Sequence, residues 1–258
     1  MPDVDVVLQG FHLGSDQGRF GLAGVYLIRG SRTVLVDTAH VGRRELLLRR
    51  LAELDVKPAD IDVVVITHAH WDHALNVDLF PNAEVLLHPE ELSYIKSPHV
   101  RDWATPPWMD AVLSRCRLGE ATDGLRLAEG VSIIATPGHT WGSVSVGVLR
   151  GDTRLAIVGD ALPNARSALL GNPYNVFADD EDAVKSLSRL VAEYTEFYPG
   201  HDRPFSLLDG KVTYLADSQL NVHGSLDTGD SDVSVRIAAV PPPKAFRLLS
   251  DLGVGENQ

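Results

Sequence analysis

The chain has 258 residues, enough for one large domain or two small ones, and its 44% hydrophobic share suits a soluble globular protein. The formal net charge of −12 argues against nucleic acid and other polyanionic partners. One cysteine, Cys116, excludes an internal disulfide and a cysteine-based zinc finger. No apolar run reaches the length of a membrane span and no secretory signal is visible, so we expect a cytoplasmic protein without a membrane partner.

Apolar and alternating runs in the first half of the chain predict strands joined by short connections. Leu47, Leu51 and Leu54 share one face of a predicted helix, and Gly30-Ser31 marks a hairpin turn. In chain order we expect a strand over 4–8, a glycine-rich loop over 10–24, a hairpin of 25–28 and 33–36, a helix over 42–54, a strand over 61–66, a short helix around 72–79 and a strand over 83–87.

The second half begins with a less regular segment over 97–120, in which we expect a helix near 108–116. Strands at meander spacing follow, and Asp179 can cap a helix whose inner face would include Val184 and Leu187. The expected elements are strands over 125–128, 131–136, 143–149 and 154–158, a loop over 161–178, a helix over 180–193, a strand over 196–198 and a helix over 207–222. We expect one catalytic domain over 1–225 and a C-terminal extension over 226–258, with an edge strand over 233–240 and a flexible tail.

The segment Thr67-His68-Ala69-His70-Trp71-Asp72-His73 concentrates three imidazoles and a carboxylate directly after the predicted strand over 61–66. The end of a strand is where α/β folds build sites, and imidazole and carboxylate are ligands for zinc and similar cations. So much histidine in one loop has little structural purpose. The segment therefore predicts a metal site.

Three later strands end in the same way, with a small or turn-forming residue followed by a candidate ligand. These endings are Pro137-Gly138-His139, Gly159-Asp160 and Pro199-Gly200-His201. Glycine lets the backbone come close to a metal because no Cβ stands in the way. Five histidines and two aspartates at four strand ends form a constellation that chance would rarely produce.

Seven candidate ligands are too many for one catalytic ion, which needs about three protein ligands and an open position. Two divalent ions fit better, with His68, His70 and His139 on the first, Asp72, His73 and His201 on the second, and Asp160 bridging both. Two ions roughly 3.5–4 Å apart would share a bridging hydroxide at neutral pH. Asp72 is the candidate proton shuttle to the leaving group. Zinc is the expected metal, with iron or manganese as alternatives.

The segment His68-Ala69-His70-Trp71-Asp72-His73 resembles the HxHxDH signature of the metallo-β-lactamase superfamily. His139, Asp160 and His201 are similar to the downstream ligand positions of that family, and the resemblance covers roughly residues 4–205. It implies a four-layer αββα sandwich, an α/β (α+β) fold, with a dinuclear site at one edge.

Asp160 stands where the true β-lactamases have a cysteine, so β-lactam hydrolysis is not the expected activity. The layout resembles the lactonase-like and glyoxalase II-like branches, which implies hydrolysis of a small ester, lactone or thioester. There are two departures from the lactonase pattern. Leu75-Asn76 replaces a glycine pair, and Pro163 replaces a tyrosine, for which Tyr174 is a candidate substitute.

Other functions stay open at this point. A phosphodiesterase of the same fold would use the same ligands, and a mononuclear iron persulfide dioxygenase would need only His68, His139 and Asp160. A non-catalytic metal-binding module is a third class, against which Asp72 argues because a pure binding site needs no proton shuttle. We expect a small-molecule substrate, and a homodimer stays open.

Several residues around the constellation have competing interpretations. Asp37 is a candidate hydrogen-bond partner for a ligand histidine, with Thr67 and Asp202 as weaker candidates. The tryptophans Trp71, Trp103 and Trp108 would line a substrate pocket or pack their loops. For the remaining histidines an ordinary surface or capping role is favoured, namely His12, His40, His88, His99 and His223.

Overall fold

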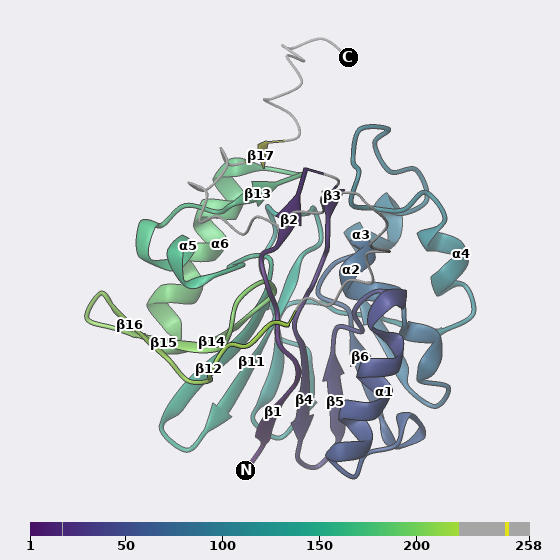
Figure 1. The fold of residues 1–258 in the computed structure, drawn as a ribbon, viewed down its shortest axis with the longest axis horizontal. Helices are drawn as coiled ribbons and strands as arrows, with labels where there is room; N and C mark the ends of the chain where they lie inside the picture. The colour runs from purple at the N-terminus through teal and green to yellow at the C-terminus, as the bar shows by residue number, and fades with distance from the viewer. Residues whose placement is uncertain (17, 222–245, 248–258) are drawn as a thin grey trace, which may run out of the picture.

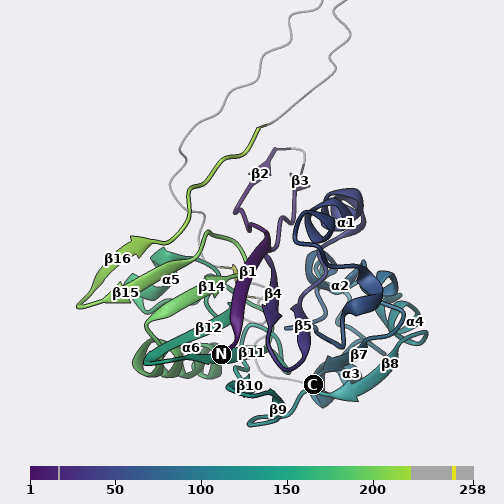
Figure 2. The same ribbon diagram turned by 90° about the horizontal axis from the view of Figure 1, so that it is seen from below.

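Two β-sheets pack face to face, and helices cover the outer face of each sheet (Figure 1). The structure, a computed structural model, describes residues 1–16, 18–221 and 246–247. A view turned by 90° shows the same succession of helices, sheet, sheet and helices (Figure 2). This is the αββα sandwich that the sequence predicted.

The first sheet carries the N-terminal part of the chain. Its strands are, in spatial order, β1 (Asp3–Leu8), β4 (Val25–Arg29), β5 (Thr33–Val36), β6 (Val63–Val65), β7 (Glu84–Leu87) and β8 (Arg117–Glu120). Strands β1, β4 and β5 are antiparallel, and β5 to β8 are parallel. The helices that accompany this sheet are η1 (Val41–Arg43), α1 (Arg44–Glu53), η2 (Pro58–Asp60), α2 (Trp71–Ala74), η3 (Val77–Leu79), α3 (Pro89–Tyr94) and α4 (Met109–Leu113).

The second sheet carries the C-terminal part. Its strands are, in spatial order, β16 (Lys211–Tyr214), β15 (Phe205–Leu208), β14 (Glu196–Pro199), β12 (Thr153–Gly159), β11 (Val144–Arg150), β10 (Val131–Ala135) and β9 (Arg126–Ala128). Strands β12 and β14 are parallel, and the other neighbours are antiparallel. Helices α5 (Ala165–Leu170) and α6 (Asp180–Glu193) pack on the outer face of this sheet.

The apolar run in β6 shows how the layers form. Val63 and Val65 pack into the core between the two sheets, while Val64 packs into the core under the outer helices together with Leu47 of α1. All four side chains are fully buried. A parallel strand covered on both faces needs apolar residues at every position, which explains the continuous run of valines.

Two small ribbons lie outside the main sheets. Strands β2 (Gly14–Ser15) and β3 (Gly18–Arg19) form a short hairpin inside the segment 10–24, and β13 (Asn175–Val176) pairs in parallel with β17 (Phe246–Arg247). The predicted edge strand over 233–240 lies outside the described residues, as does most of the extension over 226–258.

The predicted helix over 207–222 is wrong, because β15 and β16 form an antiparallel hairpin there. The turn between the strands is Asp209-Gly210, and both residues have positive φ angles, 50° and 72°. An Asp-Gly pair with two positive φ angles is typical of a tight hairpin turn. That local signal favours a hairpin over the predicted helix.

Three further elements differ from the prediction. Residues 117–120 form the edge strand β8, and α5 lies inside the predicted loop over 161–178. Asp179 does cap α6 by accepting a hydrogen bond from the Asp182 amide. Val184, however, is 42% exposed, and the buried face of α6 is rotated toward Ala183 and Leu187.

The described part of the chain contains no helix that combines the length and apolar character needed to span a membrane.

Candidate metal centre

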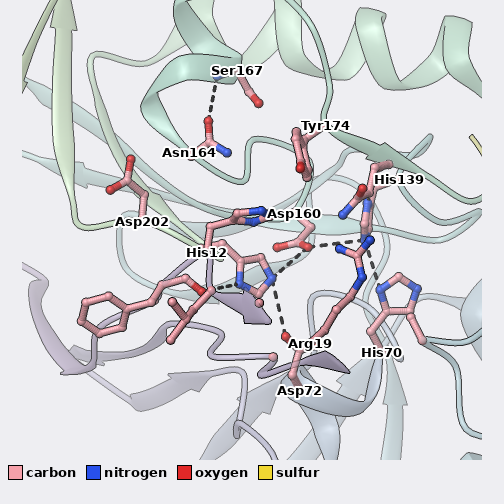
Figure 3. A pocket seen from close by; sticks show the side chains of 18 of the residues that line it. His12, Arg19, His70, Asp72, His139, Asp160, Asn164, Ser167, Tyr174 and Asp202 are labelled. Carbon is pink, nitrogen blue, oxygen red and sulfur yellow. Dashed lines mark hydrogen bonds and ion pairs between the residues drawn. The ribbon is translucent and has the colours of Figure 1, made fainter. Parts of the chain in front are cut away.

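The ends of strands from both sheets gather at one edge of the sandwich and hold the candidate ligands there. Strand β6 leads into the segment 67–73 and β10 precedes His139, while β12 and β14 lead into Asp160 and His201. Parallel neighbours place their carboxyl ends at the same edge, so residues far apart in the chain meet. Figure 3 shows His70, Asp72, His139 and Asp160 converging on one pocket.

The structure brings all seven predicted ligands together. Three overlapping groups have potential ligand atoms within 4.8 Å of one another, namely His68, His70 and His139, then His68, His73 and Asp160, and finally Asp72, His73 and His201. The first and third groups are the two sets expected from the sequence. The second group joins them through Asp160.

The first group has the spacing of ligands around one ion. His70 Nδ1 lies 3.0 Å from His68 Nε2 and 3.2 Å from His139 Nε2. A tetrahedral ion with bonds of about 2.0–2.1 Å holds its ligand atoms about 3.3 Å apart. The three nitrogens therefore fit one shared cation.

Asp160 contacts histidines of both groups. Its Oδ2 atom lies 3.6 Å from His139 Nε2 and 3.2 Å from His201 Nε2, and its Oδ1 atom lies 3.6 Å from His73 Nε2. One carboxylate thus stands between the two sets. Asp72 belongs to one set only, because its oxygens lie 3.5 Å from His201 Nε2 and 4.0 Å from His73 Nε2.

A second layer of hydrogen bonds orients the imidazoles. Asp37 Oδ2 accepts from His73 Nδ1 at 2.7 Å and from the Thr67 hydroxyl at 2.9 Å, and Asp37 Oδ1 accepts from the Thr67 amide. The Thr67 hydroxyl also lies 3.1 Å from His68 Nδ1. Asp37 and Thr67 therefore have the orienting positions that the sequence suggested. Asp202 instead accepts hydrogen bonds from the Ala165 amide and the Tyr214 hydroxyl.

Burial and nearby charges shift the pKa values of the candidate ligands. Burial lowers the pKa of His68, His70 and His139, which favours the neutral imidazole that binds metals. Burial opposes protonation of His73 as well, but the carboxylates around it, Asp37 first, raise its pKa to about 10. Burial likewise disfavours ionisation of Asp160, yet the nearby histidines, His201 first, hold its pKa well below the ordinary value.

The donor set fits divalent cations. The His73 Nε2 and Asp160 Oδ1 atoms are buried and have no hydrogen-bond partner, which is costly for polar atoms unless a cation binds them. Carboxylates face this cluster of imidazoles, and nitrogen with oxygen ligands suits zinc, iron and manganese. The residues present therefore form groups able to hold divalent metal ions.

Glycines let these loops approach one another. A Cβ on Gly200 would overlap the Asp160 carboxylate, and a Cβ on Gly138, which has a φ of 124°, would overlap the backbone of Ala183 at the start of α6. The sequence predicted that such glycines let the backbone approach a metal. The structure shows that their partners are a candidate ligand and a helix.

The roles of two buried residues near the candidate ligands were not predicted from the sequence. Glu91 on α3 is fully buried and accepts hydrogen bonds from the Ala69 amide and the Gly142 amide, each at 3.0 Å. It thereby connects the loop of His68 and His70 to the loop that follows His139. Asn76 donates from its side chain to the carbonyls of Thr38 and His40, at 2.9 and 2.8 Å.

The sequence did not predict the role of either residue. Glu91 follows Glu90 in the first turn of a helix, where acidic residues are common at exposed positions. Asn76 stands where the resemblance suggested a glycine. Only their burial in the structure distinguishes them.

A cavity of about 1070 Å³ opens beside the candidate ligands. Trp71 and Trp103 line it, as do Tyr174 and His12, whereas Trp108 is not among the lining residues. Trp71 also packs against Ala104 and Phe177. It therefore both lines the pocket and packs its loop, the two roles considered from the sequence.

The remaining histidines mostly have the expected ordinary roles. His40, His88 and His99 each accept a hydrogen bond from a backbone amide two residues ahead. His12 differs, because it lines the cavity, and His223 lies outside the described residues.

Comparisons with known proteins agree with this geometry. The chain matches the family model "Metallo-beta-lactamase superfamily" over residues 18–201. It is 30% identical to metallo-beta-lactamase domain-containing protein 1 of Xenopus laevis, over 80% of this chain and 82% of that protein. It is also 30% identical to a probable metallo-hydrolase of Methanocaldococcus jannaschii, over 66% of this chain and 70% of that protein.

Solved structures share the fold at lower identity. A putative metallo-beta-lactamase from Thermotoga maritima superposes with a TM-score of 0.63 and 21% identity, covering 80% of this chain and 99% of that one. AidC, a dizinc quorum-quenching lactonase, superposes with a TM-score of 0.61 and 17% identity, covering 77% and 80%. These structures show the shared fold. The family match and the curated relatives show that the chain belongs to the metallo-beta-lactamase superfamily and is a metallo-hydrolase of that family.

Proposed function

We propose that this protein is a dinuclear metal-dependent hydrolase that acts on a small ester, lactone or thioester. The observation that carries the proposal is the position of Asp160, whose carboxylate lies within 3.6 Å of His139 and of His73. These histidines belong to different groups. A carboxylate placed between two sets of imidazoles is suited to bridging two cations.

Each group has its own task in this proposal. His68, His70 and His139 would hold one ion, and Asp72, His73 and His201 would hold the other. Zinc is the metal we propose. Two bound ions would supply Lewis acidity and a nucleophile at neutral pH.

Asp72 is the residue we propose for proton transfer. It lines the cavity, and its Oδ2 atom lies 3.5 Å from His201 Nε2, so the carboxylate borders both the candidate ligands and the substrate space. A carboxylate in this position can accept a proton from the attacking water and pass it to the leaving alcohol or thiol.

The cavity supports a small organic substrate. Aromatic side chains, Phe177 and Trp103 among them, form one wall beside His70 and His139. Apolar walls with polar groups at one end are the usual construction of a small-molecule site. The reacting carbonyl would lie at the ligand end, with the acyl or alcohol part along the aromatic wall.

Metal analysis of the purified chain and turnover of an ester, lactone and thioester panel test the proposal together. We expect close to two zinc ions per chain, and Asp160→Ala should lower this toward one and abolish turnover. Asp152→Ala is the matched control, because Asp152 is exposed in the turn just before β12, whereas Asp160 directly follows that strand. It should leave metal content and turnover unchanged.

Several outcomes would overturn the proposal. One is a single ion per chain with full activity in Asp160→Ala. Another is bound iron with oxygen consumption on a persulfide, which would identify a dioxygenase that needs only His68, His139 and Asp160. Turnover of phosphodiesters alone would identify a phosphodiesterase of the same fold.

A further inference from the structure

The short hairpin of β2 and β3 places a cation at the cavity beside the candidate ligands. Arg19 ends β3 and lines the cavity, with its guanidinium carbon 4.6 Å from the centre of the Trp103 ring. Figure 3 shows Arg19 among the side chains that extend into the pocket, together with His12 and Tyr174. Those two rings contact each other edge to face at 4.8 Å.

The base of this hairpin is attached to the metal-binding segment. Gly21 has a φ of 54°, and a Cβ at this position would overlap the Trp71 indole. Phe11 pairs with Leu22 through an amide–carbonyl hydrogen bond of 2.8 Å. These contacts fix Phe11, Gly21 and Leu22, at the base of the hairpin, relative to the segment of the candidate ligands.

A row of aromatic contacts connects Arg19 to the candidate metal centre. Trp103 contacts Phe177 at 5.5 Å between ring centres, and Phe177 contacts His70 at 4.6 Å. A substrate lying along this wall would have one end at the ligands and the other at the guanidinium. The wall itself is apolar, so it would hold the carbon chain between those ends.

The charge of Arg19 is available to a ligand. The ion pairs among residues 1–16 and 18–221 include none between Arg19 and a carboxylate, although the whole chain carries a net charge of −12. Stacking on an indole leaves the edge of the guanidinium exposed, with its N–H donors in the plane that binds carboxylates in a bidentate way. The guanidinium carries one positive charge and two parallel N–H donors, which match the charge and the two oxygens of a carboxylate.

We propose that the substrate is an acyl compound with a free carboxylate several atoms from the scissile carbonyl, and that Arg19 binds this carboxylate. The inference rests on the proposed function for the position of the reacting carbonyl. The binding step itself does not require turnover. Arg19 is thus a specificity residue at the far end of the aromatic wall.

Binding is measured first, with probes that the enzyme is not expected to cleave as esters. The probes are the mono-anilides of succinic, adipic and suberic acid, each compared with the neutral compound in which a primary amide replaces the carboxylate. Calorimetric titration uses the zinc-loaded full chain, Arg19→Gln, and Arg126→Gln as a matched control. Arg126 is an exposed arginine on β9 that is absent from the cavity lining.

We expect at least one anionic probe to bind about tenfold more weakly to Arg19→Gln than to the unchanged chain. Neutral probes should bind both proteins equally, and Arg126→Gln should behave like the unchanged chain. Raising the salt concentration should weaken the anionic probe selectively. Equal affinity of Arg19→Gln and the unchanged chain for every anionic probe would overturn the proposal.

Turnover separates this inference from the proposed function. The p-nitrophenyl half-esters of the same diacids, compared with their terminal amides, should show the Arg19→Gln effect mainly in KM for the charged members. Loss of kcat for charged and neutral esters alike would contradict a specificity role. If no ester is cleaved but Arg19-dependent binding persists, the proposed reaction fails while the anion site stands.

Discussion

Three candidate ligand histidines have their Nδ1 atoms engaged before any metal is considered. His73 Nδ1 contacts Asp37 at 2.7 Å, His139 Nδ1 contacts the Asn175 carbonyl at 2.7 Å, and His68 Nδ1 contacts the Thr67 hydroxyl at 3.1 Å. Such partners fix the ring orientation and select the nitrogen that remains for the metal. In these three histidines that nitrogen is Nε2.

Asp37, which accepts the hydrogen bond from His73 Nδ1, has an unusual backbone conformation. Its φ angle is 62°, in the left-handed region that aspartate and asparagine tolerate better than most residues. The turn directly after β5 lets the carboxylate oxygens reach Thr67, which follows β6, and His73 on α2. A strand-end aspartate was therefore a useful sequence signal, while its precise partners came from the fold.

Glu91 offers a prediction at the scale of a single residue. Glutamine at position 91 provides one acceptor oxygen, so either the Ala69 amide or the Gly142 amide would face an NH₂ group. We expect Glu91→Gln to lower the free energy of unfolding by about 1–3 kcal/mol, because it leaves a buried donor without its acceptor. The midpoint of urea unfolding measures this change.

Glu90→Gln is the matched control for this experiment. Glu90 precedes Glu91 on α3 and is exposed, so its substitution should change stability by no more than about 0.5 kcal/mol. Equal midpoints for the two variants would show that Glu91 does not hold the ligand loops together.

At the scale of elements, the ends of strands build the site and glycines let them converge. Gly10, Gly159 and Gly200 lie against one another, because a Cβ on Gly10 would overlap the Gly200 carbonyl and a Cβ on Gly200 would lie 3.1 Å from Gly159. The Gly200 amide also donates to the Gly159 carbonyl at 2.8 Å. This packing brings the ends of β12 and β14 close enough for Asp160 and His201 to share a cation.

Gly200→Ala tests this packing. The added methyl group would displace the Asp160 carboxylate, and misplacement of a reacting group by about 1 Å can cost about 100-fold in rate. We expect a loss of that size in kcat/KM on any substrate the enzyme accepts, together with weaker retention of the second metal ion during dialysis.

The control for this substitution is Gly30→Ala. A Cβ on Gly30 would lie 3.7 Å from its nearest neighbour, Pro2, which is ordinary van der Waals contact. Its activity and metal content should match those of the unchanged chain. An active, fully loaded Gly200→Ala protein would mean that Asp160 can move without consequence.

The misassigned elements have two physical causes, a local turn signal and pairing with distant segments. The helix predicted over 207–222 was wrong because the Asp209-Gly210 turn, with two positive φ angles, favours a hairpin. Strand β8 carries Arg117 and Leu118 at an exposed sheet edge, where little apolar patterning is required. Edge strands and short ribbons depend on pairing with distant segments, which local sequence does not encode.

At the scale of the whole molecule, the candidate site lies where the two sheets meet. Ions bound there would raise the free energy of unfolding of the whole domain. The segment 67–73 follows β6 of the first sheet, while His139, Asp160 and His201 follow strands of the second sheet. Ions held between them would cross-link the halves of the sandwich in the folded state alone. Ligands that bind only the folded state stabilise it by mass action.

We therefore expect chelation to lower the melting temperature by about 5–10 °C, and zinc to restore it. Differential scanning calorimetry with and without a chelator measures the shift. Asp160→Ala should show a smaller shift than the unchanged chain, and Asp152→Ala an equal one. If neither the chelator nor zinc changed the melting temperature, no ion would connect the two sheets.

The sequence by itself determined the layout of the main strands, the strand-end position of seven ligand-type residues and the family to which they belong. These features are local, because periodicity, turn residues and motif spacing act between neighbours in the chain. The sequence also suggested Asp160 as a bridge between two groups of ligands. Tertiary structure alone decided the distances from Asp160 to the histidines of each group, that Glu91 connects two ligand loops, and that Arg19 faces the cavity. Each of these contacts joins residues that are distant in the chain, and only the packing of one sheet and its loops against the other brings them together.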